Sequence, residues 1–215
     1  MKTHSVICFC LLVTSTYSSA DEFDSADYNT TISFNEENRI ALDGGSSGWY
    51  FAPHIGYNMI SNSSTEGVTI KYANGISFGG GFGVEVKQDL AFQFDFGYIR
   101  NDVDRMTNDG TGNGSEPDIE FTQIPLMFNL IWSPSNQPDI KPYFGLGIGA
   151  IRGKYESNAF VSSDAEWALA GEFRIGLKID LSTTSNLTLG YQFTLAQYDD
   201  NIDNHTLGLG FEFRF

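Results

Sequence analysis

Cysteine is nearly absent from this 215-residue chain: the only two, Cys8 and Cys10, lie among its first ten residues. Residues 1–20 begin with a basic side chain, continue with an apolar run from Val6 to Val13, and end on small residues up to Ala20. This pattern is typical of a cleavable secretory signal, with cleavage expected after Ala20. We therefore predict a signal peptide over residues 1–20 and a mature chain that depends on no disulfide or thiol.

Long apolar runs and basic residues are also scarce. After the signal no run reaches the length of about 18 apolar residues that a spanning helix needs, so a transmembrane helix is excluded. The chain holds 12 Lys and Arg against 27 Asp and Glu, a net charge of −15, which excludes binding to nucleic acid. Residues 21–48 are polar and acidic without sustained periodicity, and they are predicted to form a flexible arm.

From Trp49 onward, large apolar side chains alternate with small or polar ones, which indicates strands with two different faces. Each segment has roughly the ten residues that a tilted strand needs to cross a bilayer. The pattern predicts an all-β fold, an eight-stranded antiparallel up-and-down transmembrane β-barrel over residues 49–215. The eight predicted strands are residues 49–59, 76–86, 90–98, 120–132, 142–155, 166–179, 186–197 and 205–215.

The connections alternate in length, as they do in outer-membrane barrels. Long polar loops are expected at residues 60–75, 101–117 and 156–165, with a shorter member of the same class at 198–204, and short turns are expected at 87–89, 133–141 and 180–185. A soluble barrel of the lipocalin type would instead turn its apolar face inward. The interior of eight strands is too narrow for rings such as Phe92 and Phe94, so we expect the apolar face to contact lipid.

The last residues, FEFRF, place Phe211, Phe213 and Phe215 on one face of the final strand. This ending resembles the sorting signal read by the bacterial barrel-assembly machinery. Residues 49–215 resemble the small eight-stranded OmpA-like and OmpX-like barrels, without the OmpA-type periplasmic domain. The resemblance implies a monomer in the bacterial outer membrane, in contact with lipid and lipopolysaccharide, with residues 21–48 on the periplasmic side.

Several charged residues fall on the small, inward face of the predicted strands. A buried charge is costly unless it is paired, so these residues are expected to form salt bridges. Such a network can plug the barrel; in the OmpA-like family, lumenal pairs of this kind are thought to block or switch a narrow pore. The predicted network consists of Glu85, Asp95, Glu172, Arg174, Lys178, Glu212 and Arg214.

No cofactor is expected, with calcium at an external loop as the alternative. The spacing of Asp109, Thr111, Asn113 and Glu120 approaches that of a twelve-residue calcium loop. Thr111 replaces the usual Asp or Asn, and Glu116 stands where an apolar residue is usual. A flexible acidic loop explains the same residues.

Catalysis is not expected. After cleavage only His54 and His205 remain; His54 faces inward, and His205 lies near Asp203. A serine hydrolase needs a Ser beside its His, yet Leu207 occupies the neighbouring position on that face.

Three classes of function follow. The first is a non-catalytic outer-membrane protein that contributes to envelope integrity or surface interaction through its loops. The second is a narrow gated channel for ions or very small solutes, since eight strands do not enclose a wide pore. The third is a lipid-modifying or proteolytic surface enzyme.

Overall fold

The computed structural model describes residues 48–65, 67–87, 89–108, 110–134, 140–157, 165–198 and 201–215. The predicted signal peptide and nearly all of the predicted arm lie outside these ranges. The described residues contain no helix long and apolar enough to span a membrane. The strands are β1 (Trp49–Ile60), β2 (Ser63–Thr65), β3 (Val68–Tyr72), β4 (Gly75–Lys87), β5 (Leu90–Asn108), β6 (Gly114–Ser115), β7 (Ile119–Trp132), β8 (Ile140–Ser157), β9 (Glu166–Ser182), β10 (Ser185–Gln197) and β11 (Asn201–Arg214).

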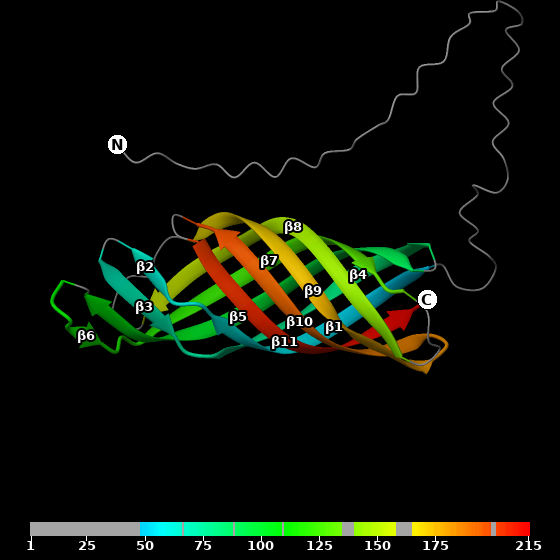
Figure 1. The fold of residues 1–215 in the computed structure, drawn as a ribbon, viewed down its shortest axis with the longest axis horizontal. Helices are drawn as coiled ribbons and strands as arrows, with labels where there is room; N and C mark the ends of the chain where they lie inside the picture. Colours follow the sequence, from blue (N-terminus) through cyan, green and yellow to red (C-terminus); the bar gives the residue numbers. More distant parts are fainter. Residues whose placement is uncertain are drawn as a thin grey trace, which may run out of the picture. The chain divides into compact units, whose positions relative to one another are not determined.

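Eight of these strands form a closed antiparallel barrel (Figure 1). Around the ring they follow the order β1, β4, β5, β7, β8, β9, β10 and β11, and β11 pairs back with β1. Closure leaves no unpaired strand edge, as a structure within hydrocarbon requires. The predicted eight-stranded up-and-down barrel is confirmed.

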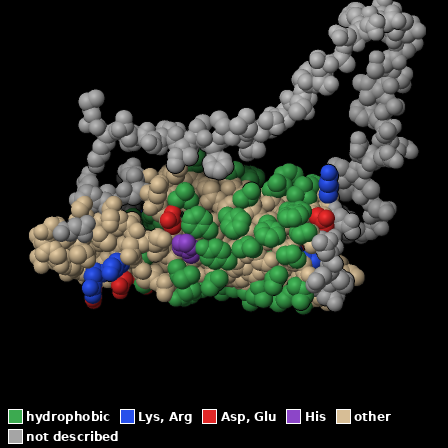
Figure 2. Space-filling view, in the orientation of Figure 1, with side chains coloured by type: hydrophobic (Ala, Val, Ile, Leu, Met, Phe, Trp, Pro, Cys, Tyr) green, Lys and Arg blue, Asp and Glu red, His purple; other side chains and the backbone are tan. Residues whose placement is uncertain are grey.

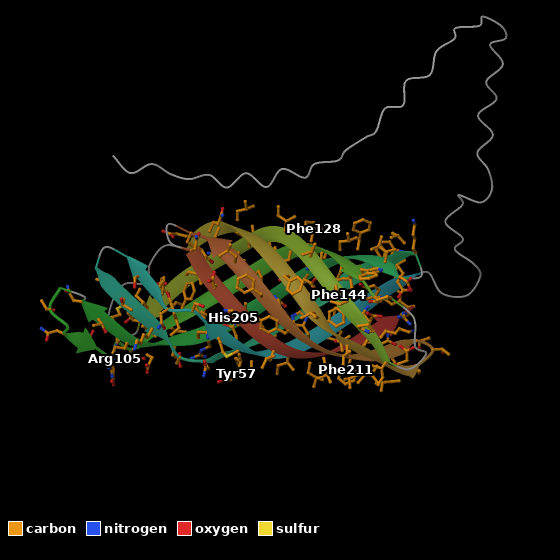
Figure 3. The ribbon with its side chains drawn as sticks, in the orientation of Figure 1. Tyr57, Arg105, Phe128, Phe144, His205 and Phe211 are labelled. Carbon is orange, nitrogen blue, oxygen red and sulfur yellow. The ribbon has the colours of Figure 1, made fainter. Side chains whose placement is uncertain are left out.

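The two faces of each strand differ as the alternation predicts. Figure 2 shows hydrophobic side chains gathered on the visible face of the barrel, and Figure 3 shows Phe128, Phe144 and Phe211 on its outer surface. Phe128 is 65% exposed, whereas its neighbours Met127 and Asn129 are almost fully buried inside. The large rings therefore lie outside the barrel and the small and polar residues inside.

The final residues close the ring. Phe213 lies opposite Phe51 of β1, and the backbone N–H of Phe215 donates to the carbonyl of Trp49 at 3.1 Å. Glu212 is buried in the interior, while Phe211 and Phe213 are exposed on the outer face. The residues FEFRF thus keep the alternation of outward and inward side chains up to the last hydrogen bond between β11 and β1.

Two of the predicted long loops are wrong in part, because they contain strands. β5 has 19 residues and continues through Asn108, well past its predicted end. Its last residues pair with β3 and β6, so strand ladders satisfy backbone groups that a loop would leave to water. In Figure 1 these strands extend the barrel at the end opposite the C-terminus. In this class of barrel the long connections are extracellular, and we call this part the extracellular extension (β2, β3, β6 and the adjoining ends of β5, β7 and β8).

The interior beneath the extension is apolar. Tyr72, Phe121, Tyr155 and Tyr198 form what we call the aromatic cap, packed with Ile60, Val103 and Ile202. The hydroxyls of Tyr72 and Tyr155 are 2.7 Å apart, and the rings of Phe121 and Tyr155 stack with centroids 4.4 Å apart. A second apolar cluster lies deeper, formed by Met127, Ile151, Ala168, Ala170 and Ala196.

Candidate functional site: the charged interior

Arg174 of β9 is the centre of the first group of interior charges. Its Nη1 lies 3.2 Å from Oδ2 of Asp95 on β5, and its Nε donates to the carboxylate of Glu172. Both carboxylates are buried and receive further hydrogen bonds. Asn129 donates to Asp95 at 2.8 Å, and Gln192 donates to Glu172 at 2.7 Å. Every charged side chain in this group therefore has an oppositely charged partner, either on the same strand or on another strand.

Glu212 of β11 is the centre of the second group. Its Oε2 lies 2.7 Å from Nζ of Lys178, and its Oε1 accepts from Asn186 at 3.0 Å and from Arg214 at 3.1 Å. Arg214 also pairs with Glu85 at 3.1 Å, near the end of the barrel that carries the short turns. This second group links β4, β9, β10 and β11 across the interior.

Tyr50 joins the two groups. Its side chain is fully buried, and its hydroxyl donates to Gln93 at 2.8 Å; Gln93 in turn donates to Asp95 at 2.7 Å. The ammonium of Lys178 lies 5.6 Å from the centre of the Tyr50 ring, within the range of a cation–π contact. The interior charges thus form one connected network.

The seven predicted network residues all line the interior, and the structure supplies their pairing, which the sequence left open. Glu212 pairs with Lys178, and Arg214 pairs with both Glu212 and Glu85. Sequence reasoning also missed the neutral members Tyr50, Gln93, Asn129, Asn186 and Gln192. Their signal was available, because each is a hydrogen-bonding side chain at an inward position of its strand.

The network leaves little free space. A cavity of about 80 Å³ lies beside it, bordered by His54, Tyr143, Arg174, Lys178 and Glu212. A water molecule takes up roughly 30 Å³ in the liquid, so the cavity has room for only a few. The arrangement can hold water and fixed charge, and the aromatic cap lies between it and the extracellular end.

The aromatic cap lies above the apolar band, at the level of the outward charges Lys154 and Glu156 of β8. Burial raises the pKa of the Tyr155 hydroxyl, and the neighbouring Tyr72 raises it further. Burial also raises the pKa of Tyr198, with an added contribution from Glu166. Both hydroxyls therefore remain protonated over the physiological range.

Residues 14–215 match the family model described as outer membrane protein beta-barrel domain. The chain belongs to this family. It is consequently a transmembrane barrel of the bacterial outer membrane, and its exposed apolar band contacts lipid. A search of curated proteins finds no match to the chain.

Solved structures agree with this assignment of the fold. Neisserial surface protein A is 20% identical, with a TM-score of 0.62, over 80% of this chain and 99% of that one. OprG from Pseudomonas aeruginosa is 12% identical, with a TM-score of 0.52, over 80% of this chain and 98% of that one. At these identities the likeness is one of fold alone.

The structure describes three of the four residues of the candidate calcium loop, and these three lie on different elements. Asp109 lies outside the described residues, while Thr111 and Asn113 belong to the turn between β5 and β6. Glu120 lies on β7, and its carboxylate is 2.7 Å from Arg100. No group of three or more His, Cys, Asp or Glu side chains is placed to hold a metal ion in the described part of the chain.

The two histidines within the described residues, His54 and His205, face opposite sides of the barrel wall. His54 borders the interior cavity, as predicted. His205 faces outward, and its Nδ1 is 2.6 Å from the hydroxyl of Tyr191. Its Nε2 is 3.4 Å from Oγ of Ser61, a serine that sequence reasoning missed because it is 144 residues away in the chain.

Proposed function

We propose that the protein is a closed, non-catalytic outer-membrane barrel that acts through its extracellular extension, in envelope integrity or surface interaction. The observation that carries this proposal is the filling of the interior at two levels, by the connected charge network and by the aromatic cap. A barrel closed in this way supplies an anchor and a rigid base rather than a path for solutes.

The charged side chains on the surface of the extracellular extension support the proposal. Its outer face carries the ion pairs Arg100–Glu120, Lys154–Glu156 and Arg105–Glu116, with N···O distances of 2.7, 2.6 and 3.4 Å. Such exposed pairs contribute little to stability, so their charges are free to engage a partner at modest cost. Figure 3 places Arg105 on this part of the molecule.

A narrow gated channel is the second candidate, favoured by the polar cavity beside Arg174. Planar-bilayer conductance of residues 21–215 separates the two candidates, with Arg174→Ala and Tyr72→Ala measured alongside the parent. The closed barrel predicts no discrete openings in the parent or in either variant, in protein shown by protease protection to be inserted. Discrete openings in the parent that grow in Arg174→Ala would replace the proposal with the channel.

The surface role has its own test in cells. A strain that lacks the protein is complemented with the parent chain or with the double variant Arg105→Ala, Glu116→Ala, which removes the exposed ion pair near the tip of the extension. We expect the parent alone to restore resistance to detergent or adhesion to a surface. Equal complementation by both chains would contradict a role for the tip of the extension.

Assembly and oligomeric state follow from the same proposal. We expect the barrel-assembly machinery to read the C-terminal strand, with Phe215 as its last aromatic residue. Deletion of Phe215 should lower the folded fraction in the outer membrane. The inserted barrel should behave as a monomer in cross-linking.

A further inference from the structure

Arg152 of β8 is an outward-facing cation at the extracellular edge of the apolar band. Its neighbours in the chain, Ile151 and Gly153, are buried inside the barrel, whereas Arg152 is exposed. Strand pairing aligns Arg152 with Ile124 of β7 and Trp167 of β9, whose exposed side chains belong to the apolar band. Tryptophan in a barrel wall is typical of the border between hydrocarbon and lipid headgroups. Arg152 therefore lies at the depth at which the headgroups begin.

Within the described part of the chain, Arg152 forms no ion pair, unlike the two cations nearest to it. Arg100 lies 2.7 Å from Glu120, and Lys154 lies 2.6 Å from Glu156. A charge at the edge of hydrocarbon gains more from an oppositely charged partner than a charge in water does, because the dielectric constant around it is lower. The position of Arg152 thus favours an anion that the membrane supplies.

Arg100 and Lys154 lie close enough to share such an anion with Arg152. Strand pairing aligns Arg100 of β5 with Thr122 of β7, and Thr122 with Lys154 of β8. Lys154 follows Arg152 by two residues on the same outward face. Neighbouring strands are about 4.8 Å apart, and residues two apart on one strand are separated by about 7 Å, so the long side chains of all three cations can reach a group of phosphate size above the short Thr122. We call Arg100, Arg152 and Lys154 the basic patch.

The existing ion pairs leave donors free on the basic patch. Arg100 contacts Glu120 through one nitrogen of a guanidinium that carries five N–H groups, and its side chain is 52% exposed. The ammonium of Lys154 has three donors, and its side chain is 34% exposed. Glu120 and Glu156 each lie two residues farther toward the extracellular end than Thr122 and Lys154. The side of the patch that faces the membrane is therefore cationic.

The outer-membrane assignment decides which anion lies at this border. The outer leaflet consists of lipopolysaccharide, whose lipid A anchor carries phosphate groups on its sugars directly above its acyl chains. Guanidinium groups bind phosphate through two parallel hydrogen bonds, which makes arginine well suited to this headgroup.

We propose that the basic patch is a binding site for one phosphate of lipid A. Arg152 is its main ligand, Arg100 and Lys154 supply further donors, and an acyl chain lies against Ile124 and Trp167. The proposal depends on the outer-membrane assignment and is independent of the surface role proposed above for the extension.

The test is the affinity of the barrel, residues 21–215 folded in detergent micelles, for fluorescently labelled lipid A. We expect Arg152→Gln to raise the Kd about tenfold, the loss that one hydrogen bond between charged groups represents. Arg152→Lys keeps the charge but loses the planar fork, and it should raise the Kd by only about threefold. A Kd like that of the parent in Arg152→Gln would overturn the proposal.

Arg105 provides the matched control for charge. It lies on β5, five residues beyond Arg100 toward the tip of the extension, and its side chain is 52% exposed. Arg105→Gln removes the same charge and should change the Kd by less than about twofold, because an exposed charge far from the headgroup is screened. Equal weakening by Arg105→Gln and Arg152→Gln would show attraction to overall charge and would overturn the site.

Two further arms identify the bound group. Lipid A without its phosphates should bind the parent about tenfold more weakly, with no further loss in Arg152→Gln, since the same hydrogen bond is then absent in both. Equal binding of the two forms of lipid A to the parent would overturn the proposal. Neither inorganic phosphate nor phosphatidylglycerol, at the same molar amount, should displace the labelled lipid. Displacement by either would assign the patch to phosphate in general and overturn a site for lipid A.

Discussion

The ammonium of Lys178 and the carboxylate of Glu212 form a 2.7 Å ion pair inside the barrel, where Lys178 is 7% exposed and Glu212 is 2% exposed. Glu212 also accepts from Asn186 and Arg214. A buried ion pair of this kind matters to stability mainly because breaking it is costly: removing one partner leaves the other charge buried without an opposite charge beside it.

Replacing Glu212 therefore tests the network directly. We expect Glu212→Gln to lower the free energy of unfolding by about 3–5 kcal/mol, because Lys178 is left buried without a carboxylate. Urea titration of the barrel in lipid vesicles measures this loss. Glu156→Gln removes an exposed pair with Lys154 and should change stability by no more than about 1 kcal/mol. Equal effects of the two substitutions would show that burial of the network is unimportant.

The lipid-facing side of the wall has a separate test. Phe128 is 65% exposed on β7, and its ring packs against Phe94 with centroids 4.9 Å apart. Phe128→Arg should destabilise the inserted barrel by about 2–4 kcal/mol, the cost of an arginine near the bilayer midplane. Thr111→Arg, in the exposed turn before β6, is the control and should have little effect. Insertion and stability like those of the parent would contradict the orientation of the wall.

Gly190 of β10 and Gly208 of β11 are paired across neighbouring strands and make a matched pair for substitution. A methyl group on Gly190 would approach the hydroxyl of Tyr143 to 2.1 Å, whereas one on Gly208 would meet nothing closer than 3.7 Å. We expect Gly190→Ala to cost about 1–3 kcal/mol through overpacking, and Gly208→Ala to be nearly neutral. The free energies of unfolding of the two variants, measured by urea titration in lipid vesicles, test this difference. Gly190→Ala combined with Tyr143→Phe should recover part of the loss.

The aromatic cap predicts a dependence on alkaline pH. The pKa values of Tyr155 and Tyr198 are raised in the folded barrel, whereas the same groups ionise near their usual value of about 10 in the unfolded chain. The contribution of these two hydroxyls to the free energy of unfolding is fully present below about pH 10. It is lost as the pH rises above that value, because the unfolded state then releases protons that the folded state retains. Urea unfolding across this range should show the fall. The double variant Tyr155→Phe with Tyr198→Phe should show a smaller one.

Much of the barrel was predictable because its wall has a strict period of two. Every outward ring from Phe92 to Phe215 follows from that alternation. Alternation does not specify how far one strand is shifted against the next, and this shift decides that Glu212 meets Lys178 rather than Arg174. The same limit concealed Ser61, which is outward by alternation but reaches His205 only through the pairing of β1 with β11.

The extracellular extension was missed for a different reason. β3 has five residues, and its alternating pattern is too short to stand out from a polar loop. It becomes a strand because the end of β5 offers it a partner from Val103 to Asn108. Strand formation here depends on a tertiary neighbour, which local sequence does not reveal.

The length of β5 has a practical consequence for reaching this protein from outside the cell. At about 3.3 Å per residue its 19 residues are roughly twice as long as the nine to eleven that cross a bilayer. The excess forms a stiff stalk, and the turn at its tip includes Gly112, which has a positive φ and open space around it. A peptide epitope inserted at this turn would be held well above the membrane and readable by an antibody on intact cells. The same insert between β9 and β10 would be hidden until the envelope is breached.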